Sequence, residues 1–323
     1  MVGDILNRIA YFASCFCITP IGLLFLYIVL QKSPSYIRSY RNNLLNITFW
    51  YYFDLLIYGL LFQPVVEFHG GRVCLKACGI GTILHPKAIY LLCSVFFVLT
   101  SNALMALWLC FLYRYAQVCS PKLANFLGTF YGYLFGSVVH IAASLGASLF
   151  AYPFVYMTKE VEVDAEPWIC MEMQHNSVIS AVLSTFAGAL LFLTTSISTF
   201  TILTIRALRS ERASLGKTTY RLQMLLTLNL VILAGIPTVC DALPVVAFCI
   251  AVYVESPKMP LISAVAAQTP FLDVLLSCVV TLIFVTPYRK AVCKLFSVKK
   301  TTATSSSGQA KLFSIVSNHP AAP

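Results

Sequence analysis

Three aspartates lie inside apolar stretches of the sequence, where a carboxyl group has an unusual environment. Asp54, Asp241 and Asp273 each fall in a run with the length and composition of a membrane-spanning helix. An ionised carboxylate facing hydrocarbon costs at least about 2.5 to 3.5 kcal/mol, and these runs hold no Lys or Arg to pair with it. The three groups must therefore face a bundle interior, where hydroxyls, amides, water, a bound cation or a proton satisfies them. Each is a candidate functional residue, with a purely structural polar contact as the alternative.

The composition indicates that lipid is the solvent for most of this chain. Hydrophobic residues make up 59% of the 323 residues, while charged residues make up only 11%. A soluble domain with this balance would expose far too much apolar surface. The net charge of +10 would suggest nucleic acid as the partner of a soluble protein, but here the placement of the basic residues relative to the bilayer decides its meaning. We expect a lipid bilayer and no nucleic acid as the partner.

Seven apolar runs are long enough to cross a bilayer core, which needs roughly 20 helical residues. The sequence therefore predicts an all-α membrane protein, in which residues 1–296 form a seven-transmembrane helix bundle and residues 297–323 form a disordered tail. Seven spans place the two termini on opposite sides of the membrane. The predicted spans are residues 9–30, 44–66, 88–113, 126–156, 177–205, 224–253 and 261–287.

The connections between these spans alternate in charge. One side, made of residues 31–43, 114–125, 206–223 and the tail from 288, carries 16 Lys and Arg residues against the single acid Glu211. The other side, which includes the N-terminus, carries 6 basic and 8 acidic residues. Because Lys and Arg are enriched in cytoplasmic connections, we expect an outside N-terminus and a cytoplasmic C-terminus. Arg114, which directly follows the third run, is expected at the aqueous interface.

The sixth run carries two prolines seven residues apart, Pro237 and Pro244, which lie on roughly the same helical face. Each removes a backbone hydrogen bond and favours a bend. Asp241 lies between them, so a ligand that contacts this segment would bias the swing of the cytoplasmic half of the helix; a static kink filled by packing is the alternative. Thr100, Gln268 and Asp273 are further candidates for the same interior pocket.

Three cysteines, Cys74, Cys78 and Cys170, fall in polar connections on the predicted outer side. That compartment is oxidising, so we expect one disulfide from Cys170 to either Cys78 or Cys74, and the sequence does not choose between them. The remaining cysteines lie in or beside apolar runs, where a thiol behaves as a small hydrophobe.

The sequence offers no combination of residues for catalysis or for metal binding. No motif supplies a convergent nucleophile and base, so we expect no enzyme. His69, His85 and His175 lie in the outer connections, but their spacing matches no compact metal-ligand motif. We therefore expect neither a metal nor another cofactor.

The second predicted span begins with a segment that resembles a known family of receptors. Residues 39–46, SYRNNLLN, are followed by Trp50, Asp54 and the pair Gln63-Pro64. This order is similar to the second-helix signature of nematode serpentine chemoreceptors of the Srh and Sri kind, in the Str superfamily of G-protein-coupled receptors.

Two later segments support the resemblance. Residues 218–223, TTYRLQ, leading to Ile236-Pro237, are similar to the entry of the sixth helix in that group, and residues 286–289, TPYR, are similar to the end of its seventh helix. The likeness covers about residues 10–296 and leaves the choice between Srh and Sri open. One departure from rhodopsin-like receptors is Tyr113, which stands where those receptors have an acid before the arginine.

The resemblance implies a chemosensory receptor that binds an external small-molecule or peptide ligand and signals to a cytoplasmic heterotrimeric G protein. It implies the plasma membrane, including that of a sensory cilium, and a role in olfaction. An ion- or proton-coupled transporter that uses the three intramembrane aspartates is the alternative. The candidate G-protein contacts are Arg114, Arg206, Arg209 and Arg289, and the candidate ligand contacts are Thr100, Asp241, Gln268 and Asp273.

Overall fold

A computed structural model gives the fold of the chain. Seven helices among the described residues are long and apolar enough to cross a membrane, which agrees with the predicted number of spans. The predicted disordered tail, residues 297–323, lies outside the described part, as do His85 and His175. The described residues are 2–34, 37–69, 72–81, 88–157, 159–163, 166–172, 177–213, 216–254, 256 and 258–296.

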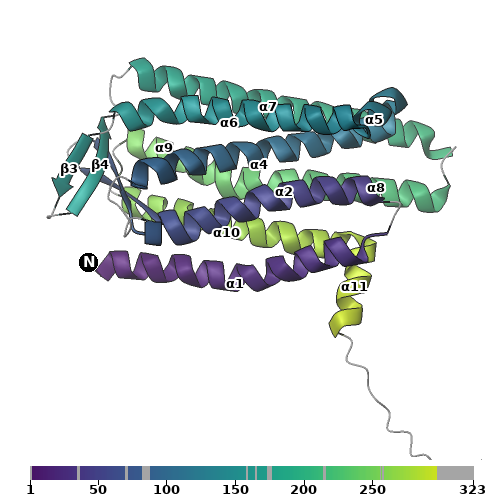
Figure 1. The fold of residues 1–323 in the computed structure, drawn as a ribbon, viewed down its shortest axis with the longest axis horizontal. Helices are drawn as coiled ribbons and strands as arrows, with labels where there is room; N and C mark the ends of the chain where they lie inside the picture. Colours follow the sequence, from purple (N-terminus) through teal and green to yellow (C-terminus); the bar gives the residue numbers. More distant parts are fainter. Residues whose placement is uncertain are drawn as a thin grey trace, which may run out of the picture.

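The helices run up and down the long axis of one bundle (Figure 1). Two spans contain a π-helical segment, which follows α2 in the second span and separates α8 from α9 in the sixth. The spans are α1 (Val2–Lys32), α2 (Arg38–Leu56) with η2 (Ile57–Phe62), α4 (Ala88–Cys119), α6 (Phe130–Met157), α7 (Ser177–Ser210), α8 (Lys217–Pro237) with η4 (Thr238–Ala242) and α9 (Leu243–Tyr253), and α10 (Met259–Phe284).

Three short helical elements join or follow the spans at one end of the bundle. They are α5 (Pro121–Leu127), η3 (Glu211–Ala213) and α11 (Thr286–Phe296). Figure 1 shows α11 turning away from the axis of the bundle there, while α1 begins at the opposite end, beside the strands. We call these two ends the α11 end and the sheet end. With 11 residues, α11 is too short to cross a bilayer core and has a length suited to lying along the membrane interface.

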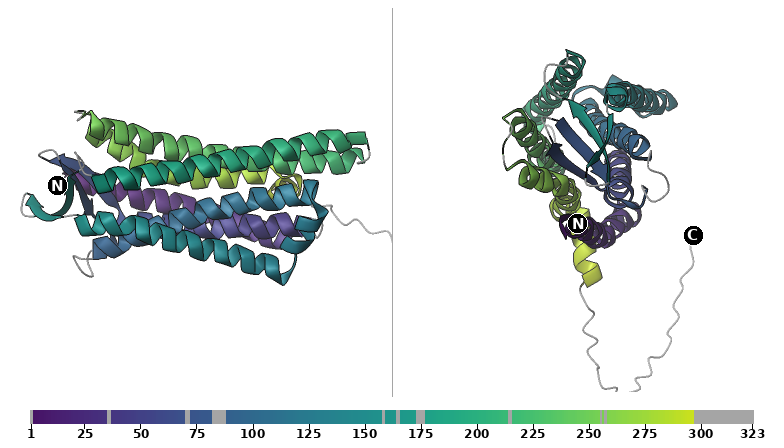
Figure 2. Two further views of the ribbon diagram at one scale, coloured as in Figure 1. Left: turned by 90° about the horizontal axis from the view of Figure 1, so that it is seen from above. Right: turned by 90° about the vertical axis from the view of Figure 1, so that its left-hand side faces the viewer.

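A four-stranded antiparallel sheet lies over the sheet end of the bundle (Figure 2, right). The sequence analysis predicted no strands in these connections, although residues 159–163, KEVEV, show the alternation typical of a strand. The strand order is β1-β2-β4-β3. The strands are β1 (Pro64–His69), β2 (Arg72–Ala77), β3 (Lys159–Val163) and β4 (Glu166–Glu172).

The sequence analysis ended the second span at residue 66, but in the structure this span ends earlier. Its last helical residue is Phe62, and Gln63 adopts a left-handed conformation with φ 45°. The fully buried side-chain amide of Gln63 donates to the Gly59 carbonyl over 2.8 Å, and its backbone N–H donates to the Tyr58 carbonyl over the same distance. These bonds satisfy carbonyls of the last helical turn, and Pro64 then begins β1.

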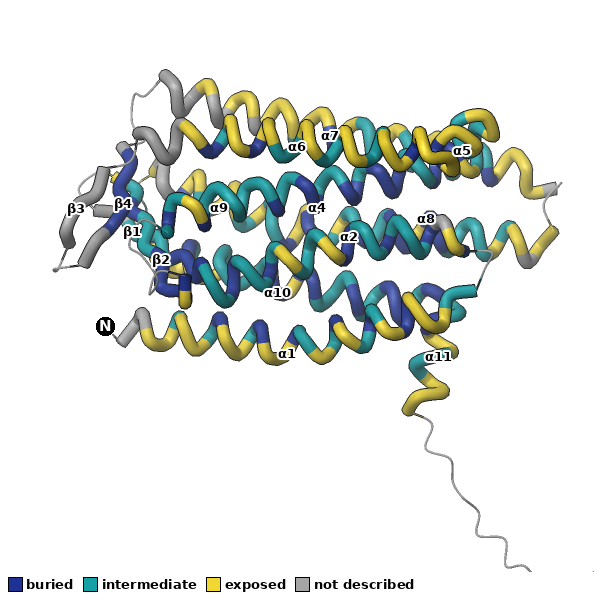
Figure 3. Tube along the Cα trace, viewed as in Figure 1, coloured by how far each residue is buried: buried dark blue, intermediate teal, exposed yellow. Residues whose placement is uncertain are grey.

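The long helix α4 lies in the middle of the bundle and packs against α2, α6, α7 and α8. By contrast, α6 and α7 have long exposed stretches (Figure 3). The exposed apolar side chains of α6 recur every three or four residues along one face, so this face is suited to lipid contact. They include Leu134, Val138, Ile141, Leu145 and Leu149.

Candidate functional site

The three intramembrane aspartates approach one another inside the bundle, and we call them the acid cluster. The ring of Tyr51 on α2 lies near all three carboxyl groups. Asp54 accepts a hydrogen bond of 3.0 Å from the Thr100 hydroxyl on α4. Asp241 on η4 and Asp273 on α10 lie within hydrogen-bonding reach of each other. The cluster therefore joins the second, third, sixth and seventh spans through polar groups.

Gln268, the remaining candidate for ligand contact, lies apart from the acid cluster. It precedes Asp273 by five residues on α10, or about 7.5 Å along the helix axis. Its side-chain oxygen accepts a hydrogen bond of 3.3 Å from the Ser14 hydroxyl on α1, and its side-chain nitrogen is buried without a partner. Gln268 thus provides a polar position between the acid cluster and the sheet end.

A π-helical turn directs Asp241 into the bundle. The backbone N–H of Leu243 donates to the Thr238 carbonyl, five residues back. Pro237 and Pro244 flank this turn, and neither has a backbone N–H to donate to an α-helical ladder. The sequence predicted a bend between the two prolines, and the structure has a π turn there; Asp241 on this turn interacts with Asp273 on the neighbouring α10.

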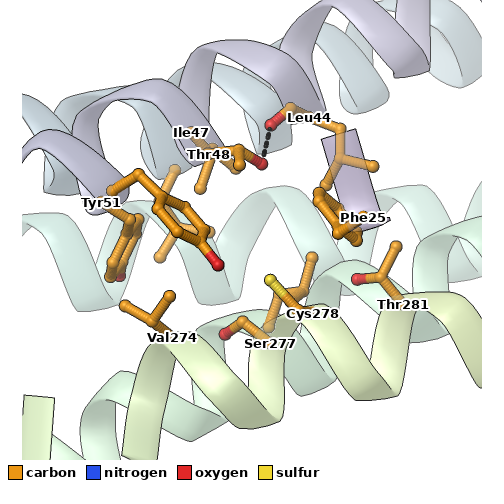
Figure 4. A pocket seen from close by; sticks show the side chains of 12 residues that line it. Phe25, Leu44, Ile47, Thr48, Tyr51, Val274, Ser277, Cys278 and Thr281 are labelled. Carbon is orange, nitrogen blue, oxygen red and sulfur yellow. Dashed lines mark hydrogen bonds between the residues drawn. The ribbon is translucent and has the colours of Figure 1, made fainter. Parts of the chain in front are cut away.

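A small cavity lies between the acid cluster and the α11 end. Its volume of about 30 Å³ is above the roughly 10 to 15 Å³ that a cavity needs to hold one water molecule. Figure 4 shows Thr48 of α2 on one side of it, across from Ser277 and Thr281 of α10. Ser277 also donates to Asp273 over 3.3 Å, so the lining of the cavity is continuous with the acid cluster.

A second buried polar group, absent from the sequence predictions, lies nearer the α11 end. The side-chain amide of Asn229 on α8 donates to the Tyr40 hydroxyl over 2.7 Å and to the Thr281 hydroxyl over 3.4 Å. Asn229 and Thr281 are both fully buried. These hydrogen bonds join α2, α8 and α10. An asparagine inside an apolar run is the sequence signal that could have predicted a buried polar contact at Asn229.

His140 is another interior residue that the sequence predictions missed. Its Nε2 lies 3.2 Å from the side-chain nitrogen of Asn46, and its Nδ1 lies 2.8 Å from the side-chain oxygen of Asn102. Its ring stacks against Trp50 with ring centroids 5.1 Å apart. A carbonyl oxygen faces its Nδ1 and an amide nitrogen faces its Nε2, which fits the neutral ring protonated at Nδ1. His140 thereby joins α6 to α2 and α4. A histidine within an apolar run was its signal.

Arg114 lies inside the bundle, and the prediction that it faces water was wrong. Its side chain is only 4% exposed. Its Nε donates to the Thr227 hydroxyl over 3.0 Å, and a terminal nitrogen donates to the Gln223 carbonyl; both acceptors are on α8. The physical reason is that α4 continues to Cys119 and carries Arg114 alongside α8, whose neutral oxygens replace its hydration. These two bonds tie the third span to the sixth.

The sequence matches the family described as serpentine type 7TM GPCR chemoreceptor Srh over residues 4–298. The chain belongs to the Srh family. The match confirms the resemblance noted in the sequence and decides between the two families that were left open. No curated protein matches the sequence significantly.

The other candidate arginines of this Srh receptor are exposed. Arg206 and Arg209 lie in the last turns of α7, and Arg289 lies on α11, so all three are at the α11 end. Beside Arg289, Tyr288 is buried and its hydroxyl lies 2.9 Å from the Ser33 hydroxyl. Burial raises the pKa of Tyr288, so its phenol stays neutral and holds α11 to the end of α1.

The disulfide of the Srh receptor joins Cys74 to Cys170, so the expected alternative of Cys78 with Cys170 was wrong. The register of the sheet is the reason, because Cys74 on β2 lies directly opposite Cys170 on β4. Cys78 follows the end of β2, where its backbone N–H donates to the Gln63 carbonyl and its carbonyl accepts from Arg8. Without predicted strands, the sequence carried no register information.

Metal ligands do not gather in the described part of the Srh receptor. No group of three His, Cys, Asp or Glu side chains lies close enough there to hold a metal ion. The hydroxyl donors to the acid cluster among the described residues are Thr100, which donates to Asp54, and Ser277, which donates to Asp273.

Proposed function

We propose that this Srh receptor binds an external small-molecule or peptide ligand on its sheet-end side and signals to a cytoplasmic heterotrimeric G protein at its α11 end. The connections at the α11 end carry the large excess of basic residues, which supports a cytoplasmic location for that end. The plasma membrane, including that of a sensory cilium, follows as the proposed location, and olfaction as the proposed sensory role.

The contact of Arg114 with α8 is the observation that carries the coupling proposal. A nearly buried guanidinium holds the sixth span against the third through two hydrogen bonds to neutral oxygens. If the sixth span moves outward, these oxygens leave and the guanidinium loses its partners. The exposed cation then becomes available to carbonyl or carboxylate groups of a protein that enters the opened end.

The ligand-binding part of the proposal rests on the acid cluster and on the residues nearer the sheet end. Asp241 lies on the π turn of the sixth span, so a ligand that changes its contacts acts on the helix that holds Arg114. Thr100 and Gln268 provide a hydroxyl and an amide in the same interior. Arg206, Arg209 and Arg289 are the proposed surface contacts for the G protein, because all three are exposed at the α11 end.

A screen of ligands with a G-protein dissociation sensor tests this function. We expect a compound that activates the sensor in cells expressing the receptor, and a loss of at least about tenfold in that response for Arg114→Ala at matched surface level. Lys122→Ala is the matched control, because Lys122 is an exposed cation on α5 at the same end. An equal response from Arg114→Ala and wild type contradicts the role of Arg114.

The convergence of Asp54, Asp241 and Asp273 also favours a second candidate, an ion- or proton-coupled transporter. Ligand-dependent uptake of protons or sodium into vesicles containing the purified receptor, with no G-protein response in cells, would support transport. A G-protein response without coupled uptake supports the receptor.

A further inference from the structure

The side chains of Asp241 and Asp273 interact inside the bundle, and each has a buried oxygen that no described donor reaches. The two side chains lie within hydrogen-bonding reach of each other. Oδ1 of Asp241 and Oδ2 of Asp273 are both buried, and no donor from the described residues reaches either atom. Asp273 as a whole is only 1% exposed. Ionised carboxylates only accept hydrogen bonds, so a bond between these two groups requires a proton on one of them.

The surroundings of the pair supply no positive charge to replace that proton. Groups from α2, η2, η4 and α10 face the two carboxyls, and each is neutral or negative at neutral pH. Ser277 donates to Oδ1 of Asp273 over 3.3 Å and leaves the other oxygen to its neighbour. The titratable groups that lie near the pair among the described residues are Tyr51, Asp54, Tyr58, Cys240 and Cys278.

We propose that Asp241 and Asp273 form a proton-binding site, in which one proton shared between the two carboxyl groups ties the sixth span to the seventh. The protonated carboxyl donates its O–H to the oxygen of the ionised one. Release of this proton to water leaves two carboxylates and no bond between them, and like charges in a buried site repel.

The shared proton has a mechanical consequence, because α10 packs directly against η4. With the proton in place, the π turn of the sixth span is held to the seventh by a charge-assisted hydrogen bond, which is among the stronger kinds. Without it, repulsion pushes the turn away from α10. The site is thus a proton-dependent contact between the sixth and seventh spans. The same sixth span binds Arg114 through Thr227, nearer the α11 end.

The sign of the pH dependence follows from linkage. A free aspartate releases its proton near pH ~3.9, so the unfolded chain holds no proton at these positions near neutral pH. The folded receptor holds one. Stability from this contact is therefore complete below about pH 3.9 and falls progressively as the pH rises from there to the range in which the folded pair releases its proton.

Infrared difference spectroscopy of the full-length receptor in lipid nanodiscs tests the site at neutral pH. Subtracting the spectrum of the double variant Asp241→Asn with Asp273→Asn from that of wild type is expected to show one protonated carboxyl band and one carboxylate band per receptor. The matched control, Asp54→Asn, removes the third acid and is expected to retain both bands. A difference of two carboxylate bands, or of two protonated bands, overturns the shared proton.

Thermal melting supplies a second readout that needs only folded protein. We expect the melting temperature of wild type to fall as the pH rises from about 4, where a free aspartate titrates, through neutral pH. The double variant, whose amides keep a hydrogen bond without a titrating group, is expected to lose this fall. If the double variant does not fold, wild type alone remains decisive, because a melting temperature that does not fall over this range contradicts the proposal. Neither measurement uses a ligand or a G protein, so failure of the proposed signalling function is distinguishable from failure of the proton site.

Discussion

Arg114 on α4 donates its Nε–H to the Thr227 hydroxyl on α8 over 3.0 Å, inside the bundle, and no carboxylate among the described residues accepts a hydrogen bond from it. The second acceptor is the backbone carbonyl of Gln223, one turn earlier on α8. The closed arrangement of the third and sixth spans thus depends on neutral oxygens, which a change of pH does not remove.

Thr227→Val tests whether this contact holds the receptor in its inactive state. Valine keeps the β-branched shape and removes the acceptor, and a hydrogen bond to a charged group contributes about 1.5 to 3 kcal/mol. We expect basal G-protein activation to rise roughly tenfold, since about 1.4 kcal/mol changes an equilibrium by that factor. The matched control is Thr199→Val on α7, whose exposed hydroxyl bonds only within its own helix. Unchanged basal activity at equal surface level counts against the contact.

The polar group around Asn229 is expected to contribute to stability. Asn229→Ala removes the donor to Tyr40 and Thr281 in a fully buried position. We expect a loss of about 1 to 3 kcal/mol in the free energy of unfolding, read as a lower melting temperature in nanodiscs. Tyr40→Phe removes only one of the two bonds and is expected to lower it less. Equal melting temperatures for all three proteins would show that this group is energetically neutral.

The disulfide predicts a difference between cysteines that lie close together in the sequence. The bond closes a separation of 96 residues, and closing a loop of this length stabilises by about 4 to 5 kcal/mol in the loop-entropy account. We expect Cys74→Ser and Cys170→Ser to lower the amount of receptor at the cell surface to the same degree, with no further loss in the double variant. Cys78→Ser is the control and is expected to keep the bond. An equal loss for all three single variants is evidence against the specific pairing.

The orientation of the bundle is open to a direct test. A tag after Pro323 is expected to be inaccessible to antibody in intact cells and accessible after permeabilisation, because the basic residues gather in the connections of the α11 end. A tag before Met1 is expected to be accessible without permeabilisation. The reverse pattern would invert the assignment and with it the proposed sides of ligand and G protein.

Much of the bundle was predictable because apolar length identifies a span without reference to other residues. The number of spans and the interior irregularity near Asp241 follow from residue types within a single helix. Contacts between helices do not, since they depend on how each helix is rotated about its axis. The sequence therefore predicted Asp241 and Asp273 as interior groups but not as neighbours.

Arg114 and the cysteines illustrate the same limit. An arginine that follows an apolar run is indistinguishable in sequence from one that reaches water, and only the packing of α4 against α8 supplies the buried oxygens of Thr227 and Gln223. The choice of Cys74 over Cys78 depends on strand register. That register is set by pairing between segments almost a hundred residues apart, and no local pattern encodes it.

The π turn at Thr238–Ala242 makes the length of the sixth span as important as its composition. The turn accommodates one residue more than an α-helix would, and each residue of an α-helix corresponds to about 100° of rotation. If the same residues formed a regular α-helix instead, everything on one side of this segment would rotate by about that angle. Asp241 and the Arg114 acceptors on α8 would then no longer face the bundle together.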